Sequence, residues 1–450
     1  MSFYTSLVSK IIFPIHERLK KHDTVRIRKD MEKTQWLSAK EIRALQLERL
    51  NSFLSDVEQH VPYYQTLFKQ LQFNPDSISS LEDLTRLPLT GKPLIREQTE
   101  HLIADNAKGL AKFNTGGSSG EPLVFYIGNK RVSHDVAAKW RATRWWDVDI
   151  GDIEGVIWGS PIELGGQDKI KQIRDKFLRT HLIPAFEMSP VKIDGFIQQI
   201  KALKPKMLFG YPSALAHIAT HAEKTGQVLN DLGIKVAFVT SERLYDYQRE
   251  KIEQVFACPV ANGYGGRDAG FIAHQCPEGQ MHITAEDIIV EIIDNNGQVL
   301  ANGEAGEIVV THLATNDFPF IRYRTGDIGI LSDQSCSCGR GLPLLKEIQG
   351  RTTDFIIAQD GTVLHGLALI YVLRDIEGIE SFKITQYSLD DTTVQIVKNQ
   401  QYNQESEVKI QQEFKQRLGE KVMINVEYIE SIAKEKSGKF RYVVSHVKPN

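Results

Sequence analysis

The stretch 113–127, FNTGGSSGEPLVFYI, contains residue types that bind phosphate. Three glycines and three hydroxyl side chains fill six consecutive positions, Thr115, Gly116, Gly117, Ser118, Ser119 and Gly120. Glycine permits positive φ and close backbone approach, so successive N–H groups can surround an anion while the hydroxyls add donors. The loop has no lysine, and the apolar residues after it predict a strand, unlike a Walker-type P-loop. It therefore predicts a phosphate loop between two strands, with an ordinary surface turn as the alternative.

Four later motifs offer further groups that suit a nucleotide. Tyr264-Gly-Gly-Arg-Asp268 supplies an aromatic face for a base and a carboxylate for a metal ion. Arg322-Tyr-Arg-Thr-Gly-Asp327 ends in an acid that suits ribose hydroxyls. Gly350-Arg351-Thr-Thr-Asp354 offers a cation, and Lys436-Ser-Gly-Lys439-Phe-Arg441 places a lysine in a predicted loop. Each motif alone could be a surface turn, whereas five in this order indicate one site.

The elements that must position these motifs alternate between strands and helices. Apolar runs predict buried strands at 155–158, 206–210 and 235–240, and helical spacing predicts helices at 132–146, 193–203 and 245–256. This order predicts a mainly parallel sheet covered by helices, where ligands bind beyond the carboxyl ends of the strands. Gly210-Tyr-Pro-Ser213, Thr240-Ser-Glu242 and Gly263–Asp268 all follow predicted strands.

The two ends of the chain differ from this middle part. Residues 20–100 are rich in helix signals, and Leu47, Leu50, Leu54 and Val57 form one apolar helical face. After Gly350 the pattern predicts helices and alternating strands, at 367–376, 381–387, 392–398, 405–418 and 422–428. The predicted fold class is therefore α/β, with a large N-terminal domain at 1–350 and a small α+β domain at 351–450.

Composition excludes several classes of protein. The 450 residues exceed what one core usually supports, so two or more domains are expected. Lysine and arginine number 54 against 57 acidic residues, giving a net charge of -3, which argues against a nucleic-acid binder. No apolar run is long enough to span a membrane, and four cysteines do not make a disulfide scaffold. We expect a cytoplasmic protein.

The N-terminal segment SLVSKIIFPIHERLKK has a short apolar run followed by basic residues. A secretory signal has the opposite order, which excludes that interpretation. Two alternatives remain: a helix that lies on a membrane surface, or one that packs on the protein body, with Pro14 interrupting it.

The five motifs together resemble the adenylate-forming superfamily of acyl-CoA synthetases, adenylation domains and luciferases. Within it the chain is most similar to phenylacetate–CoA ligase-like proteins, including those of capsular polysaccharide loci. The resemblance covers about residues 60 to 447. It implies that a carboxylate attacks the α-phosphate of ATP to give acyl-AMP and pyrophosphate, and that CoA or an amine then displaces AMP.

The resemblance also implies a role for each matching residue. Thr115 to Gly120 would hold the β- and γ-phosphates, Tyr264 would stack on adenine, and Asp268 would ligate Mg²⁺. Asp268 stands where most of the superfamily has Glu, and Arg267 where most has Thr, which leaves the α-phosphate contact open. Asp327 would accept the ribose hydroxyls. The remaining nucleotide-binding residues would be Ser241, Glu242, Gly265 and Arg351.

By the same resemblance Lys439 is the main catalytic candidate. A compact ammonium suits the negative charge on the α-phosphate and on the attacking carboxylate. Because Lys439 lies in the small domain, it would serve adenylation only when that domain is closed. Rotation near Asp354, which matches the family's hinge position, would then withdraw it for the second half-reaction.

Cysteine spacing predicts a zinc site. His274-Gln-Cys276 pairs with Cys336-Ser-Cys338-Gly, which makes a Cys₃His set with a glycine suited to a knuckle. Such a site would be structural, joining two loops far apart in the chain. Free thiols with a surface histidine are the alternative. Cys258 lies in an apolar run and is expected to pack in a core.

Three questions stay open at this stage. The acyl acceptor is CoA or, alternatively, an amine on an amino sugar or amino acid. A non-catalytic nucleotide-binding scaffold is a further alternative, although Lys439 argues against it. Neither the carboxylic acid nor the oligomeric state can be read, although five aromatic residues fall where the superfamily builds its acyl pocket: Trp140, Trp145, Trp146, Trp158 and Tyr211.

Overall fold

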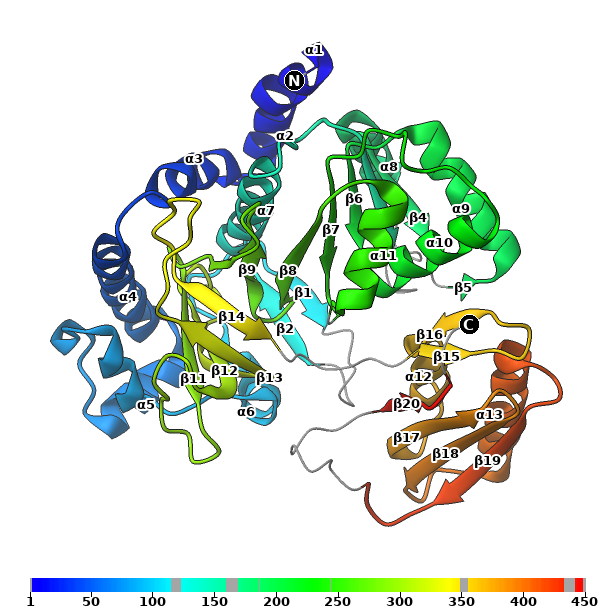
Figure 1. The fold of residues 1–450 in the computed structure, drawn as a ribbon. Coiled ribbons are helices and arrows are strands. Elements are labelled where there is room, and N and C mark those ends of the chain that lie inside the picture. Colours follow the sequence, from blue (N-terminus) through cyan, green and yellow to red (C-terminus); the bar gives the residue numbers. More distant parts are fainter. Residues whose placement is uncertain are drawn as a thin grey trace.

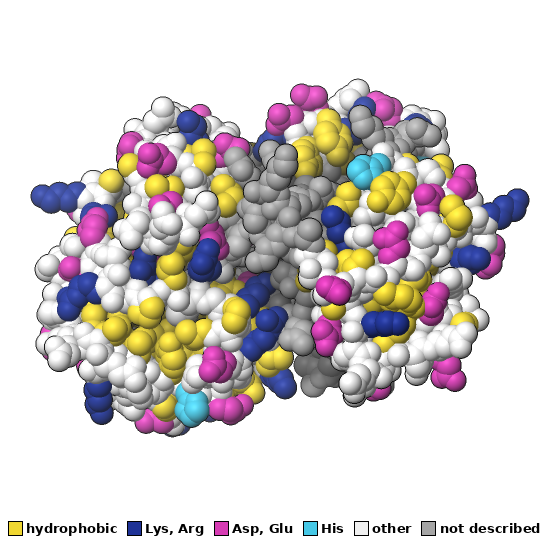
Figure 2. Space-filling model, turned by 90° about the horizontal axis from the view of Figure 1, so that it is seen from below, with side chains coloured by type: hydrophobic (Ala, Val, Ile, Leu, Met, Phe, Trp, Pro, Cys, Tyr) yellow, Lys and Arg dark blue, Asp and Glu magenta, His cyan; other side chains and the backbone are white. Residues whose placement is uncertain are grey.

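A computed structural model describes residues 2–114, 123–158, 169–185, 187–242, 244–348, 355–432 and 442–447. The predicted phosphate loop Thr115–Gly120 lies outside the described residues, as do Arg351, Asp354 and Lys439. Figure 1 shows a large body, from blue to green-yellow, and a smaller C-terminal module from β15 onward. Seen from below, the two parts form two lobes (Figure 2).

The N-terminal part is helical, as expected. It begins with α1 (Phe3–Leu7), a π-helical turn η1 (Val8–Ile12) and α2 (Phe13–Leu19), so the helix continues through Pro14 and is not interrupted there. Leu50, Leu54 and Val57 are fully buried on one face, which confirms the predicted apolar stripe. The other helices here are α3 (Thr24–Thr34), α4 (Ala39–His60), α5 (Pro62–Leu71) and α6 (Lys92–Gln98), with 3₁₀ turns η2 (Pro75–Ser77), η3 (Leu81–Arg86) and η4 (Thr99–Leu102).

Half of the eleven-stranded central sheet is parallel. Its strands run in the order β8-β7-β6-β3-β4 and are β3 (Glu154–Trp158), β4 (Thr180–Pro184), β6 (Met207–Gly210), β7 (Val236–Thr240) and β8 (Val260–Gly266). Every residue of β6 and β7 is buried, as expected for strands covered on both faces. The connecting helices confirm the predicted alternation: α8 (Lys169–Leu178), α9 (Pro190–Leu203), α10 (Pro212–Lys224) and α11 (Asp246–Phe256).

The other half of the sheet is antiparallel, so the sheet is less parallel than the sequence suggested. Only Arg267, Asp268 and Ala269 join β8 to β9, and parallel strands need a crossover of a dozen or more residues. The strands run in the order β11-β12-β13-β14-β10-β9. They are β9 (Gly270–Gln275), β10 (Met281–Ile283), β11 (Ile288–Ile293), β12 (Ala305–His312), β13 (Phe320–Ser332) and β14 (Leu344–Ile348).

The strands on either side of the predicted phosphate loop pair with each other. β1 (Ala111–Asn114) and β2 (Val124–Ile127) are antiparallel, with Asn114 opposite Val124. This pairing confirms a strand-to-strand connection at the loop. The helix α7 (Asn129–Arg144) follows β2.

The C-terminal module has its own sheet and core. Strands β17 (Ile379–Ser388), β18 (Asp391–Lys398), β19 (Met423–Tyr428) and β20 (Val443–Ser445) form a sheet in the order β19-β18-β17-β20. The helices α12 (Leu367–Arg374) and α13 (Gln404–Leu418) contribute to a core with Ile384, Ile396 and Phe414. The module is thus the expected α+β unit.

One small ladder connects this module to the body. β16 (Val363–His365) pairs with β15 (Phe355–Ile357) on one side and with β5 (Glu187–Met188) of the body on the other. We call the β16–β5 pairing the clasp.

Among the described residues, no helix combines the length and the apolar character needed to cross a lipid bilayer.

Candidate active site

Three predicted motifs meet at one edge of the parallel half-sheet. β6, β7 and β8 are neighbours, with Gly210 opposite Val239 and Thr240 opposite Gly263 (Figure 1). Their carboxyl ends therefore lie side by side, and the segments 210–213 and 240–242 leave the sheet there. The motif 263–268 only partly follows its strand, because β8 continues to Gly266 and the connection to β9 begins at Arg267. This is the edge at which open α/β sheets bind ligands.

Ser241 and Glu242 form a tight turn directly after β7. Ser241 is exposed and has φ of 73°, in the left-handed region that a residue with a side chain rarely adopts. Ser213 donates its hydroxyl hydrogen to Glu242 Oε2, which ties this turn to the motif after β6. Strained backbone of this kind is concentrated at functional sites.

Tyr264 and Asp327 contact each other across the sheet. The Tyr264 hydroxyl donates to Asp327 Oδ2 at 3.0 Å, joining two motifs that are 63 residues apart. The Asp327 backbone N–H donates to Thr325 Oγ1 at 3.1 Å, and Thr325 in turn donates to the Ile308 carbonyl at 2.9 Å. The residues expected on the adenine and ribose sides of a nucleotide are thus adjacent.

Gly265 has a structural reason to be glycine. A bulge interrupts the β8–β9 pairing between Tyr264 and Gly265, and a Cβ atom at 265 would overlap the Gly270 carbonyl. The close strand approach fixes the direction of the Tyr264 side chain.

Asp268 is held by hydrogen bonds to both carboxylate oxygens. The Tyr323 hydroxyl donates to Oδ2 at 2.6 Å, and the Ala269 N–H donates to Oδ1 at 3.1 Å. An ionised carboxylate can accept about four hydrogen bonds, so each oxygen keeps a lone pair. A half-buried carboxylate oriented in this way fits the donor chemistry of Mg²⁺, which takes one or two protein carboxylates and completes its shell with water and phosphate.

A buried arginine supports the turn that carries Asp268. Arg131 is 2% exposed, and its guanidinium donates to the carbonyl oxygens of Arg267 and Asp268, both at 3.3 Å. Its Nε donates to Asp135 Oδ2 at 2.9 Å. The Asp135 carboxyl is partly buried, which disfavours its charge, yet the Arg131 charge and the neighbouring histidines hold its pKa well below the usual range.

The five aromatic residues separate into two groups. Trp158 and Tyr211 lie at the ends of β3 and β6, with ring centroids 4.5 Å apart, next to the segments described above. Trp140 is 3% exposed and packs edge-on against Phe13, so it belongs to a core. Trp145 and Trp146 also make structural contacts, since their indole N–H groups donate to Gln35 and to the Gln275 carbonyl.

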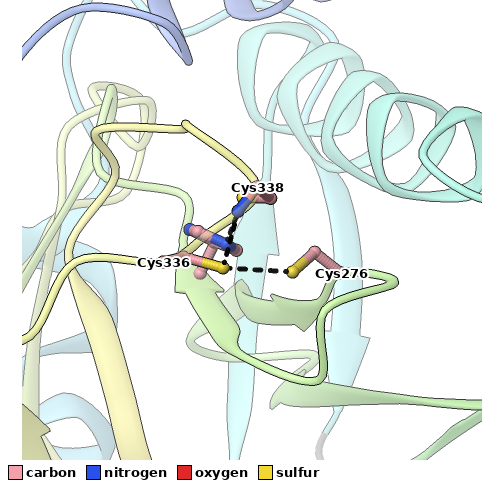
Figure 3. A group of neighbouring side chains, drawn as sticks. Cys276, Cys336 and Cys338 are labelled. Atoms are coloured by element: carbon pink, nitrogen blue, oxygen red, sulfur yellow. Dashed lines mark hydrogen bonds between the residues drawn. The ribbon is translucent and has the colours of Figure 1, made fainter.

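The cysteine cluster forms, with a different histidine. Cys276, Cys336, Cys338 and His282 bring their ligand atoms within 4.8 Å of one another. Figure 3 shows Cys276 and Cys336 turned toward each other, with sulfur atoms 3.6 Å apart. Cys338 Sγ lies 3.3 Å from His282 Nε2. A zinc tetrahedron with Zn–S bonds of about 2.3 Å has S···S edges of about 3.8 Å, so these separations fit the metal.

The prediction that His274 is the histidine of this cluster was therefore wrong. The strand β9 ends at Gln275, so Cys276 begins a turn and no longer shares the strand geometry of His274. The His274 ring is fully buried between Phe238 and Phe271, and burial lowers its pKa to about 3. His282 lies opposite His274 on β10 and reaches the cysteines.

The local backbone shapes the Cys336–Gly339 turn for a metal. The Cys338 N–H points at Cys336 Sγ at 3.5 Å (Figure 3), and Gly339 has φ of 81°. Burial raises the pKa of the Cys276 thiol and raises that of Cys336 to about 12. Zinc binding must therefore displace protons from these thiols. Cys258, by contrast, is 4% exposed in an apolar core, as predicted.

Comparison with known proteins finds similarity to one group of ligases over most of the chain. Residues 356–446 match the CapK C-terminal domain. The chain is 24% identical over 423 residues to Protein CapK of Staphylococcus aureus, covering 90% of this chain and 89% of that protein. It is 27% identical over 336 residues to phenylacetate-coenzyme A ligase of Thermus thermophilus, covering 71% and 73%. Most of the chain is thus similar to CapK and to phenylacetate-coenzyme A ligases.

The fold of the chain agrees with that similarity. A crystal structure of 2-hydroxyisobutyryl-CoA ligase with 2-HIB-AMP and CoA matches with a TM-score of 0.65 at 21% identity, covering 91% of this chain and 90% of that one. The α/β body followed by a C-terminal domain is thus the fold of adenylate-forming ligases.

Proposed function

We propose that this ligase-like protein activates a carboxylic acid as acyl-AMP, with release of pyrophosphate, and then transfers the acyl group to CoA. The observation that carries the proposal is the contact between Tyr264 and Asp327, with Asp268 two residues past the end of β8, the strand that carries Tyr264. This contact supports a nucleotide site whose base, ribose and metal positions come from separate segments. The phenylacetate-coenzyme A ligases among its relatives support CoA as acceptor.

In this proposal the described residues bind and orient ATP. Tyr264 covers the adenine while its hydroxyl steadies Asp327, which accepts the ribose hydroxyls. Ser241 and Glu242 line the adenine side, and Thr115–Gly120 hold the β- and γ-phosphates. Asp268 and the Tyr323 hydroxyl hold the position of Mg²⁺, which when bound neutralises charge on the phosphates. Trp158 and Tyr211 form a flat wall for the acyl group.

Lys439 supplies the catalytic cation in this proposal. Residues 1–350 would form the adenylation domain and 351–450 the small domain, which rotates near Asp354 and brings Lys439 to the α-phosphate. Arg351 would contact the ribose and phosphate beside the hinge. Arg267 remains a candidate for the α-phosphate contact.

We further propose that the Cys₃His cluster holds structural zinc. β9 carries the Asp268 turn at one end and Cys276 at the other, and its six residues span about 20 Å. That distance places the metal too far from the nucleotide for chemistry. Four cysteines without a disulfide in a chain that would use ATP and CoA also support a cytoplasmic location.

The test has two steps on the purified protein. Pyrophosphate release is first measured across a panel of carboxylic acids with ATP and Mg²⁺. The best acid is then supplied as acyl-AMP together with CoA or with amino sugars and amino acids. Thioester formation is the expected result. Amide formation would show that the acyl acceptor is an amine and not CoA. ATP binding without pyrophosphate release from any acid would overturn the enzyme assignment.

Two variants assign the steps. Lys439→Ala should lower ATP–pyrophosphate exchange by about 10²–10³, as for loss of one preorganised charge, and leave transfer from supplied acyl-AMP intact. Asp327→Ala should mainly raise the KM for ATP, because it removes charged hydrogen bonds worth about 1.5–3 kcal/mol each. Full exchange activity in Lys439→Ala would remove that lysine from the mechanism.

A further inference from the structure

The first helical segment, Phe3–Leu19, presents apolar side chains on two opposite sides. On the inner side Val8 and Phe13 are buried, and the Phe13 ring packs edge-on against Trp140 with centroids 5.1 Å apart. Thr5 donates its hydroxyl hydrogen to Asp152 Oδ1 at 2.7 Å, which fixes the start of the segment. The segment is therefore part of the body and presents its other side in a fixed direction.

The outer side carries an exposed apolar stripe. Phe3, Ile11, Ile15 and Leu19 are 86%, 52%, 56% and 80% exposed, and the partly buried Leu7 completes a series with one apolar residue every four positions. Single exposed apolar side chains are ordinary, but a continuous stripe on one element marks an interaction surface. Figure 1 shows this segment at the edge of the molecule, with α1 projecting beyond the body.

The π-helical turn keeps the stripe on one face. Four residues slightly exceed an α-helical turn of 3.6, so a stripe with this spacing drifts by about 40° per step in an α-helix. The turn η1 (Val8–Ile12) holds more residues than an α-turn and opposes this drift between Leu7 and Ile11. Pro14 accounts for the turn, because its ring would clash with the carbonyl four residues earlier.

The exposed charged side chains within residues 3–21 are all basic. Lys10, Arg18, Lys20 and Lys21 are exposed, and among the described residues none of them forms an ion pair. The acid within the segment, Glu17, is 4% exposed and turned inward, where it bonds with His16, His22 and Thr24. The face of the molecule seen in Figure 2 instead mixes basic and acidic side chains.

We propose that this stripe, with its four flanking cations, docks the protein on an anionic lipid bilayer. A helix with an apolar stripe and basic flanks lies in the plane of the headgroups, where apolar burial and attraction to anionic lipids add together. A second copy of the chain is the weaker candidate, because a two-fold interface brings the same patch of both copies together and would place like charges side by side. The segment of about 25 Å, interrupted by charges, lies on the bilayer and does not span it.

The test measures vesicle binding by the full chain. Co-sedimentation is compared for vesicles of neutral phosphatidylcholine alone and for vesicles with a quarter of anionic phosphatidylglycerol. We expect binding to the anionic vesicles, weakened by salt, and at least about tenfold weaker binding for Ile11→Gln/Ile15→Gln. Lys20→Gln/Lys21→Gln should lose the preference for anionic lipid. Val191→Gln, which removes an 81% exposed apolar side chain on α9, is the matched control and should bind as the parent does.

Light scattering on the same variants distinguishes the two candidate partners of the stripe, an anionic bilayer and a second copy of the chain. A monomeric parent that binds anionic vesicles supports the proposal. A parent that dimerises through Ile11 and Ile15 and ignores both kinds of vesicle would overturn it in favour of a second copy, and equal binding by the double glutamine variant would overturn it as well. Melting temperatures establish that the variants fold, and neither readout depends on ligase activity.

Discussion

At the scale of single residues, Asp268 shows how the site depends on partners from distant segments. Its carboxylate is oriented by Tyr323 from β13, and its backbone carbonyl is held by Arg131 from α7. Neither partner is close to Asp268 in the sequence. The acid is therefore positioned before any ligand arrives.

Removing the Tyr323 hydroxyl tests this positioning. Tyr323→Phe keeps the buried ring but loses a hydrogen bond to a charged group, worth about 1.5–3 kcal/mol. ATP–pyrophosphate exchange should fall about 10–100-fold, with a higher Mg²⁺ requirement. Tyr387→Phe, at an exposed position of the C-terminal module, is the control and should keep the parent's activity. An unchanged Mg²⁺ requirement in Tyr323→Phe would contradict this role.

The Arg131–Asp135 pair should be strongly coupled. Arg131→Met leaves the partly buried Asp135 carboxylate without its partner, and breaking such a pair usually costs about 3–5 kcal/mol of stability. Arg131→Met/Asp135→Leu should recover part of that loss. Denaturant unfolding of the two single variants and the double variant measures the coupling, and additive losses would contradict it.

His217 gives stability a defined pH dependence. Burial in α10 lowers its pKa from 6.5 to about 4, with a smaller contribution from His221. Between pH 6.5 and 4 the unfolded chain binds the extra proton, so the contribution is complete above pH 6.5 and is lost as the pH falls. The slope is at most about 1.4 kcal/mol per pH unit. His217→Gln should unfold with a shallower pH dependence in this window, measured by urea titration at each pH.

At the scale of elements, the strand β9 connects the proposed nucleotide site with the proposed zinc site. It carries the Asp268 turn at its start and leads to Cys276 at its end. Next to the cysteines, Arg340 stacks over Trp145 at 4.5 Å, and both donate to Gln35 of the N-terminal helices. Around the cysteine cluster, the end of β9 therefore lies close to three separate segments, which contain Gln35, Trp145 and Arg340.

Zinc content distinguishes the two histidines. His282→Asn should lose stoichiometric zinc and melt at a lower temperature, since a ligand is removed. His274→Asn should keep its zinc even though a buried site is changed. Elemental analysis of both variants is the measurement. Retention of zinc by His282→Asn, or loss of zinc from His274→Asn alone, would contradict this assignment and favour His274 as the ligand.

The sequence predicted the elements with strong local signals. Buried parallel strands such as β6 and β7 are continuous apolar runs, and the C-terminal helices and strands have clear periods. The antiparallel half of the sheet was missed because its order depends on short connections and not on composition. His282, Tyr323 and Arg131 were missed because their roles arise only from contacts across the fold. An aromatic residue inside the 322–327 motif was the one available signal for Tyr323.

At the scale of the whole molecule, the proposed membrane surface and the proposed nucleotide site occupy different regions. The candidate nucleotide residues lie near the carboxyl ends of β6, β7 and β8, while the N-terminal apolar stripe lies on the helical edge of the body. A protein bound to a membrane through the stripe could still bind and convert substrates at the nucleotide site. Activity measured in solution would therefore leave the surface role unseen.

The clasp between β16 and β5 opposes the rotation that we propose for the C-terminal module. It consists of two residue pairs, Val363 with Met188 and Leu364 with Glu187. Each backbone hydrogen bond contributes only about 0.5–1.5 kcal/mol net, so releasing the pairing costs at most a few kcal/mol. A longer ladder would oppose the rotation of the module that the proposed two-step reaction requires. A pairing of only two residues is compatible with that proposed rotation.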